Sequence, residues 1–118
     1  MGYTYLGSPY SHIDSSVMEW RFREACRYAA AMVADGIRVF CPIAHSHPLV
    51  AYGAPQCSAK IWQYQDKPFL DGAASLSVLM LPHWYDSVGL QAEIQSALLA
   101  HKKISYITWK QGSNGSQP

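Results

Sequence analysis

Two kinds of hydrophobic pattern alternate along the chain, and the change from one to the other separates strands from helices. Short, nearly continuous apolar runs are typical of buried strands, whereas apolar residues that recur every three or four positions are typical of helices. Four runs predict strands, at Tyr3 to Ser8, Arg38 to Cys41, Leu76 to Leu81 and Ile104 to Trp109. Continuous runs of this kind suit strands that are covered on both faces of a sheet.

Helical spacing fills most of the chain between these runs. Ser16 and Glu19 form a capping-box pattern that predicts the start of a first helix, and Gly36 predicts its end. Its predicted inner face consists of Met18, Phe22, Ala25, Cys26, Ala29, Met32 and Val33. Further helices are predicted from Lys60 to Asp71 and from Ser87 to Lys102.

The segment from Pro42 to about Ala59 shows no clear period and contains two turn-rich stretches, Ala44 to Pro48 and Gly53 to Pro55. Structureless segments of this length are uncommon in small domains and are often functional. We therefore expect a functional loop at this point in the chain.

Strands that alternate with helices predict an α/β fold of three layers, Rossmann- or flavodoxin-like, with a parallel sheet of four to five strands and helices on both faces. We expect one domain over residues 1–109 and a flexible tail over residues 110–118, which are rich in Gly, Ser, Gln and Asn. Ligands of such sheets bind beyond the carboxyl ends of the strands. The segments expected there are Gly7 to His12, Pro42 to Pro48 and Pro82 to Ser87.

Composition and charge exclude several kinds of partner. Of the 118 residues 49% are hydrophobic and 14% are charged, and the net charge of +1 includes no basic run. A nucleic-acid polymer is therefore not an expected partner. The chain has neither a long apolar span nor the pattern of a signal peptide, so we expect no membrane partner and a cytoplasmic location. The three cysteines form no CxxC pair and suggest no disulfide framework.

Glu93 is the most informative residue of the chain. The helix that carries it has an apolar stripe at Leu90, Ile94, Ala97 and Leu98, and Glu93 lies along that stripe. Because an unpaired buried carboxylate is costly, this position indicates either a cleft or dedicated partners, and both indicate a site. The alternative is a boundary glutamate near the first helical turn, where the helix dipole favours acids.

Several familiar kinds of site are not supported. The spacing of His12, His45, His47 and His83 contains no HExxH motif, and no cysteine pair accompanies them, so we expect no metal. A Gly-x-Ser-x-Gly elbow and a glycine-rich dinucleotide fingerprint are both lacking at the strand ends, which argues against a serine hydrolase and against NAD.

Carboxylates and hydroxyls remain as the candidate chemistry at this edge. Two carboxylates in one cleft can divide the work of glycosyl transfer, and hydroxyls near a helix start suit a phosphate. Structural alternatives exist for several candidates. Asp71 would end a helix, Asp86 would cap one, His47 would hold a loop by hydrogen bonds, and Tyr5 would be plain packing.

Two segments, Tyr5-Leu6-Gly7-Ser8-Pro9 and Ser87-Val88-Gly89-Leu90-Gln91-Ala92-Glu93, together with an acidic helix before the third strand, give the chain its resemblance to a known family. It resembles the nucleoside 2-deoxyribosyltransferase superfamily, including its nucleoside 5'-monophosphate N-glycosidase branch. The similarity covers most of Tyr3 to Trp109. It implies a homodimer or larger homo-oligomer that acts on a small nucleotide or nucleoside without a cofactor.

The resemblance also implies roles for individual residues. Glu93 would attack the anomeric carbon, Tyr5 would orient it, and Asp66 would help to protonate the leaving base. A serine at position 87, where enzymes for free nucleosides tend to have aspartate, implies a 5'-monophosphate, because a carboxylate would repel it. The other expected substrate-binding residues are Ser8, Ser11, His47, Asp71, Asp86 and Gly89.

The leading hypothesis is therefore cleavage of an N-glycosidic bond, or 2-deoxyribosyl transfer, through a covalent glycosyl-glutamate. Two alternatives from other classes stay open. One is a nucleotide-binding module without catalysis, and the other is a structural or interaction protein in which Trp84 and Tyr85 form an exposed patch.

Overall fold

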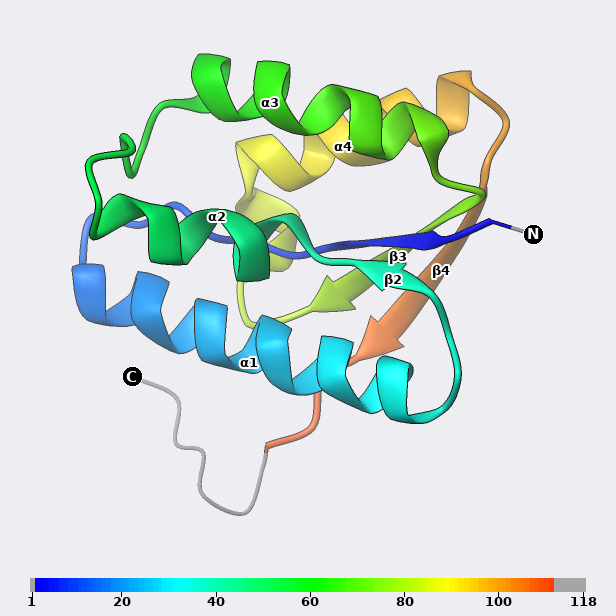
Figure 1. Ribbon diagram of the computed structural model, residues 1–118, viewed down its shortest axis with the longest axis horizontal. Helices are drawn as coiled ribbons and strands as arrows, with labels where there is room; N and C mark the ends of the chain where they lie inside the picture. Colours follow the sequence, from blue (N-terminus) through cyan, green and yellow to red (C-terminus); the bar gives the residue numbers. More distant parts are fainter. Residues whose placement is uncertain (1, 112–118) are drawn as a thin grey trace.

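A parallel sheet lies at the centre of the computed structural model, which describes residues 2–111 (Figure 1). In that part of the chain the strands are β1 (Thr4–Gly7), β2 (Val39–Phe40), β3 (Ser75–Met80) and β4 (Lys103–Thr108). They pair in the order β2-β1-β3-β4, and every pairing is parallel. From β1 the chain crosses to β2 on one side and later to β3 on the other, so the strand order reverses between β1 and β3.

Helices cover both faces of this sheet. The described helices are α1 (Ser15–Ala34), α2 (Pro42–Val50), α3 (Ala59–Gly72), the short 3-10 turn η1 (Trp84–Asp86) and α4 (Val88–Leu99). In Figure 1 α3 and α4 lie above the sheet and α1 lies below it, while α2 lies beside α1. The predicted three-layer α/β fold with a parallel sheet is confirmed.

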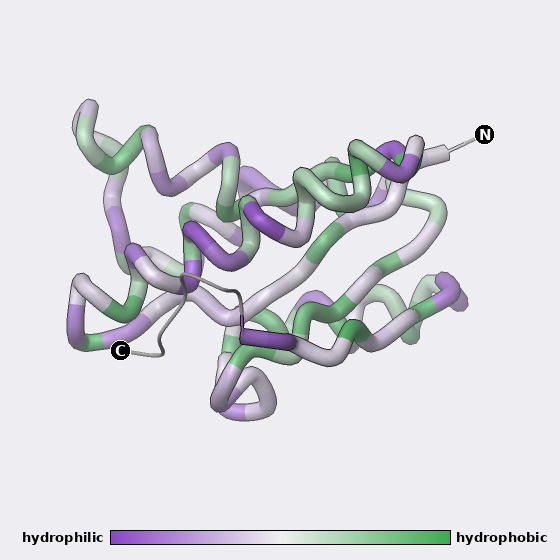
Figure 2. The backbone as a smooth tube through the Cα atoms, turned by 90° about the horizontal axis from the view of Figure 1, so that it is seen from below, coloured by the Kyte–Doolittle hydropathy of each residue, from purple (hydrophilic) through white to green (hydrophobic). Residues whose placement is uncertain are grey.

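Two hydrophobic clusters, one on each face, hold the layers together. The cluster under α3 and α4 consists of Tyr5, Leu70, Ala73, Leu76, Val78, Leu90, Ile94 and Ala97. The cluster toward α1 and the start of α2 consists of Leu6, Trp20, Ala25, Cys41, Ile43, Leu79 and Leu81. Figure 2 shows hydrophobic and hydrophilic positions alternating every few residues along the helices, as helices with one buried face require.

The prediction of a loop from Pro42 to about Ala59 was wrong for its first half, because Pro42–Val50 forms helix α2. Pro42 occupies the first turn, where a missing backbone N–H costs nothing. The helix also contains Pro48, a residue type that favours a turn. Tertiary packing outweighs the low helix propensity of proline here, since Ile43 at the start of the helix is buried in the cluster toward α1.

The expected capping box of the first helix was also wrong. Asp14, not Ser16, is the N-cap, and its Oδ1 accepts hydrogen bonds from the backbone N and the Oγ of Ser16 at 2.9 and 2.8 Å. Glu19 is thereby left free for a contact with α2. The helix ends as expected before Gly36, which has a positive φ of 80°.

The remaining strands and the end of the chain differ only in extent from the prediction. Strand β2 has two residues, and β3 and β4 each begin one residue earlier than expected. Lys110, assigned to the flexible tail, is held on α1, because its backbone N lies 2.6 Å from the Tyr28 hydroxyl and its carbonyl oxygen accepts from Arg27 at 2.6 Å. The rest of that predicted tail, from residue 112, lies outside the described residues. Within residues 2–111, every helix is too short or too polar to cross a membrane.

Candidate functional site

A pocket of about 590 Å³ opens at the carboxyl ends of β1 and β3, where the strand order reverses. Pockets of this size accept small organic ligands, and this edge of an open parallel sheet is where such ligands bind. Four elements supply its walls: the loop after β1, helix α2, helix α3 and the start of α4. Lining residues come from all three segments expected at this edge, Gly7 to His12, Pro42 to Pro48 and Pro82 to Ser87, so their predicted convergence is confirmed.

Glu93 and Tyr5 meet at the floor of this pocket. Glu93 belongs to the second turn of α4, whose buried stripe of Leu90, Ile94 and Ala97 packs on the sheet, so the carboxylate points to the end of β1. There it accepts a hydrogen bond from the hydroxyl of Tyr5, a fully buried side chain of β1. This hydrogen bond is the contact through which Tyr5 would orient Glu93.

Gly7 makes room for this arrangement. A Cβ atom at Gly7 would lie 3.0 Å from Cδ1 of Leu90 and 3.3 Å from Oε1 of Glu93. Both distances are tighter than ordinary van der Waals contact, so a side chain here would press on the carboxylate. The glycine allows α4 to approach the end of β1 closely enough for the Tyr5 contact.

Burial governs the electrostatics at the floor. The pKa of Glu93 is raised to about 8: desolvation raises it most, the hydrogen bond from Tyr5 lowers it, and the charge of Asp66 raises it by a smaller amount. Burial and the neighbouring Glu93 charge raise the pKa of the Tyr5 hydroxyl well above its usual range, so this group remains a donor. Perturbed carboxylates of this kind are typical of functional sites.

Asp66 brings a second carboxylate to the pocket from α3. Desolvation raises its pKa to about 6, against a smaller lowering by His45. Among the described residues its buried Oδ1 has no hydrogen-bond partner. A buried oxygen without a partner is unfavourable unless a ligand can use it. The two carboxylates interact electrostatically. With pKa values of about 6 for Asp66 and about 8 for Glu93, a single proton on the pair lies mainly on Glu93.

Hydroxyl groups and a helix start form the side of the pocket toward α4. Ser87 is the N-cap of α4, and its Oγ accepts from the backbone N of Leu90 at 3.2 Å. Ser8, at the end of β1, is buried, and its Oγ has no hydrogen-bond partner within residues 2–111. Ser11 lines the same pocket. Free hydroxyls and the amide groups of a helix start can bind an anion such as a phosphate.

On the α2 side, Tyr10 and His47 line the pocket. Nδ1 of His47 lies 2.7 Å from the Tyr10 hydroxyl, and Nε2 lies 2.8 Å from Oε2 of Glu19. Both ring nitrogens are therefore occupied by protein groups. This agrees with the alternative that His47 holds the local structure by hydrogen bonds, and any influence of the ring on a ligand has to pass through Tyr10.

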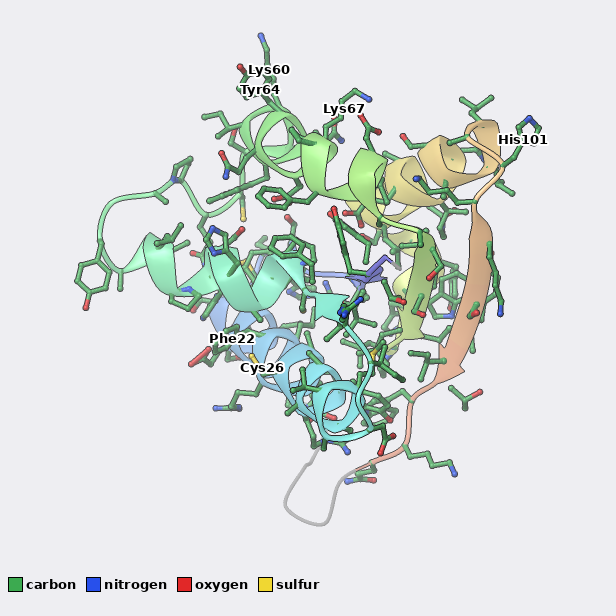
Figure 3. The ribbon with its side chains drawn as sticks, turned by 45° about the vertical axis from the view of Figure 1, so that its right-hand side comes forward. Phe22, Cys26, Lys60, Tyr64, Lys67 and His101 are labelled. Atoms are coloured by element: carbon green, nitrogen blue, oxygen red, sulfur yellow. The ribbon has the colours of Figure 1, made fainter. Side chains whose placement is uncertain are left out.

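Most of the predicted site residues lie together around this pocket. Those that line it are Glu93, Tyr5, Asp66, Ser8, Ser11, His47, Asp86, Ser87 and Gly89. Asp71 lies elsewhere, on the exposed side of α3, where its Oδ2 is 2.9 Å from Nζ of Lys67. Figure 3 shows Lys67 on the outer part of this helix, together with Lys60 and Tyr64. Asp71 belongs to the last turn of α3, which lies near the start of β3 and therefore away from the carboxyl ends of the strands.

Sequence reasoning missed four further lining residues, which come from α2, from the segment between α2 and α3, and from α3: Ser46, Gln56, Trp62 and Gln63. The indole of Trp62 is fixed by a hydrogen bond of 2.7 Å to the carbonyl oxygen of Pro55. One signal for it was available, since Trp62 precedes Asp66 by four residues in a predicted helix and must share its face. Gln56 gave no such signal, because it lies outside regular structure.

The residues between 2 and 111 contain no cluster of three or more His, Cys, Asp or Glu side chains that could hold a metal ion. The groups that line the pocket include the carboxylates of Glu93, Asp66 and Asp86, two tyrosine hydroxyls, and serine hydroxyls, of which those of Ser8 and Ser46 have no hydrogen-bond partner among the described residues.

A family model described as "Domain of unknown function (DUF1937)" matches residues 2–109, and this range contains every residue of the pocket. A search of curated proteins found no match.

Proposed function

The chain belongs to the DUF1937 family of domains of unknown function, and we propose that it cleaves the N-glycosidic bond of a nucleoside 5'-monophosphate, or transfers the 2-deoxyribosyl group to a second base. The hydrogen bond from Tyr5 to Glu93 at the floor of the pocket carries this proposal. A carboxylate oriented by a buried donor, with a second carboxylate on a neighbouring helix, is the equipment of a retaining glycosidase. The resemblance to the nucleoside 2-deoxyribosyltransferase superfamily supports the same reading.

In the proposed reaction, an oxygen of Glu93 forms an ester bond to the anomeric carbon. The bond from that carbon to the base nitrogen breaks, its electron pair leaves with the base, and the proton of Asp66 moves to the base. Water then attacks the anomeric carbon, Asp66 takes a proton from it, and the ester bond breaks. The sugar phosphate is released and Glu93 becomes a carboxylate again. A second base in place of water would give transfer.

The two sides of the pocket suit the two ends of a nucleotide. Ser87 and the start of α4, with the partnerless Oγ of Ser8, offer donors to a phosphate. Asp66 and Trp62, one helical turn apart on α3, lie where a base would meet an acid and an aromatic face. Glu93 lies between these sides, at the position of the sugar.

A second candidate function has an observation in its favour. With its pKa raised to about 8, most Glu93 side chains hold a proton at pH 7, and a protonated carboxyl group is a poor nucleophile. The same pocket would then serve a nucleotide-binding module without catalysis. Such a module would bind equally well with glutamine at position 93, and it would release no base.

The proposal includes a homodimer in the cytoplasm. Helix α4 exposes three large apolar side chains, Val88, Leu98 and Leu99, and Val88 also lines the pocket. Apolar groups so exposed are suited to a contact with a second copy. Cys26, Cys41 and Cys57 are all free, which suits a reducing compartment. Light scattering at micromolar concentration tests the dimer, and Leu99→Glu should shift the mass toward the monomer if this face is involved.

The decisive experiment is chromatography of a mixture of nucleoside and 2'-deoxynucleoside 5'-monophosphates after incubation with the protein. The Glu93→Gln variant, which keeps the shape of the side chain, is the control. Free base released by the natural chain alone supports the proposal and identifies the substrate. A second set of incubations contains added free bases, so that transfer shows as exchange of the base. Equal release by the variant contradicts the proposal, as does the absence of both release and exchange, and nucleotide binding without either favours the second candidate.

A further inference from the structure

Four residues on the α2 side of the pocket form a hydrogen-bonded chain that the proposed reaction does not use. Oε2 of Glu19 lies 2.8 Å from Nε2 of His47, and Nδ1 of the same ring lies 2.7 Å from the Tyr10 hydroxyl. The side-chain amide of Gln56 donates to that hydroxyl at 3.3 Å. Tyr10, His47 and Gln56 line the pocket, and Glu19 reaches them from α1.

The imidazole of His47 is fixed in its orientation. Phe22 stacks on it with the ring centroids 4.3 Å apart and an interplanar angle of 26°, and Tyr10 meets it edge-on at 5.6 Å. Figure 3 shows Phe22 on α1, one turn from Cys26, on the side toward α2. Because both nitrogens are bonded and one face is covered, the His47 ring does not turn toward a ligand. The Tyr10 hydroxyl is the group of this hydrogen-bonded set that can contact one.

The direction of each hydrogen bond follows from the groups involved. A carboxylate can only accept, so Glu19 fixes the proton of a neutral His47 on Nε2, and Nδ1 becomes an acceptor. The Tyr10 hydroxyl must then donate its own proton to Nδ1. Burial raises the pKa of Tyr10, so it keeps that proton. What Tyr10 presents to the pocket is the lone pair of its oxygen that Gln56 leaves unused.

We infer that Tyr10 determines specificity by selecting a ligand that presents an N–H donor, such as the exocyclic amino group of adenine or cytosine, and that Glu19 and His47 are positioning residues that set this preference. The inference rests on the proposed function for placing a base in the pocket that Tyr10 lines. A carbonyl oxygen in the same place would meet a lone pair and lose its own hydrogen bond with water.

The test compares two bases that differ in this group. Calorimetry measures the Kd values of 2'-deoxyadenosine and 2'-deoxyinosine 5'-monophosphate for the Glu93→Gln variant, in which binding is read without turnover. We expect the amino-bearing nucleotide to bind about tenfold more tightly, the difference that one hydrogen bond makes. The 2'-deoxycytidine and 2'-deoxyuridine monophosphates give a second pair.

Added substitutions in that variant separate the roles. Tyr10→Phe should abolish the preference. His47→Gln no longer offers a ring nitrogen fixed as the acceptor of the Tyr10 proton, so it should weaken the preference. Glu19→Gln, which frees the choice of the protonated nitrogen, should also weaken it.

The two proposals fail in different ways. Equal affinity for the paired nucleotides, or a preference that survives Tyr10→Phe, would overturn the role of Tyr10 even if the natural chain releases base. Discrimination by the Glu93→Gln variant, with no base released by the natural chain, would overturn the catalytic proposal and support the role of Tyr10. Failure of all four nucleotides to bind would overturn both.

Discussion

Tyr5 donates a hydrogen bond to Glu93, a residue 88 positions later in the chain. The contact exists because β1 and β3 are paired neighbours and α4 returns over them, which brings the first strand and the last helix together at one edge of the sheet. It joins a buried donor to a carboxylate that is costly to bury, and a contact of that kind is retained for a function more readily than for stability.

Replacing Tyr5 with phenylalanine should lower kcat by about 10- to 100-fold, because Glu93 loses the donor that orients it. The hydrogen bond from Tyr5 lowers the pKa of Glu93, so its loss should also move the part of the pH profile that depends on Glu93 upward. Steady-state kinetics from pH 5 to 10 measure both effects. An unchanged profile together with a reduced rate would indicate that Tyr5 only packs.

The rate should depend on pH as a bell with limbs near pH 6 and pH 8. The pKa values of Asp66 and Glu93 are raised to about 6 and about 8, so between these values the pair holds one proton, mostly on Glu93. The competent arrangement, with that proton on Asp66, is a minor and constant fraction of the one-proton form, so the rate follows the same two limbs. Below the lower value both groups are protonated and no nucleophile exists, and above the upper value both are ionised and no acid exists. Profiles of kcat/KM measure these limbs.

Asp66→Asn separates the two roles. If Glu93 is the nucleophile, the residual activity should rise with pH to a plateau and lose its alkaline limb, since only Glu93 then titrates. The midpoint should lie below 8, because the Asp66 charge that raises the pKa of Glu93 is gone. If Asp66→Asn abolished formation of the covalent intermediate and Glu93→Gln remained active, Asp66 would be the nucleophile and Glu93 the acid.

The buried carboxyl group of Glu93 should make the fold less stable as the pH rises. Its pKa in the folded chain, about 8, exceeds the ordinary value of 4.5, so the folded state binds the extra proton and the free energy of unfolding falls between these pH values. Each unit of difference corresponds to about 1.4 kcal/mol. Glu93→Gln should therefore raise Tm at pH 9 by more than at pH 5. Asp71→Asn, on the surface of α3, is the control and should show no such trend.

Ser87→Asp should exclude a substrate phosphate without disturbing the fold. Aspartate caps a helix as well as serine does, but its charge repels a phosphate at the start of α4. We expect kcat/KM for a 5'-monophosphate to fall by about 100-fold, while the corresponding nucleoside is turned over at least as well as before. Ser87→Ala removes the cap without adding charge, at a cost of about 1 kcal/mol in stability. Equal losses in both variants would argue against a phosphate beside position 87.

The fold could be predicted from the sequence because its strands are continuous apolar runs and its helices have regular stripes. Leu76 to Leu81 and the stripe of Leu90, Ile94 and Ala97 are readable without knowledge of their neighbours. Helix α2 could not be predicted in this way. Its prolines indicate a turn locally, and only the burial of Ile43 against the sheet and α1 reverses that preference.

The candidate site divides in the same way. Glu93 and Ser87 were found because their positions relative to a helix carry the information, and Asp66 was found through the resemblance. The hydrogen bonds among Glu19, His47 and Tyr10 connect three separate elements, so they could not be predicted from residue spacing in the sequence. Gly7 is a similar case. Its importance depends on how closely Leu90 approaches, a distance that only the assembled helix and strand define.

The pairing of β1 with β3 has a consequence for synthesis of the chain. Thr4 and Tyr5 pair with Ser75 and Leu76, so the first strand leaves the ribosome long before its longer partner exists. Until then it has only the two pairs with β2, at Val39 and Phe40. An N-terminal fragment that ends before Ser75 lacks β3, one of the two central strands, and the chain has to complete its folding after most of it has been translated.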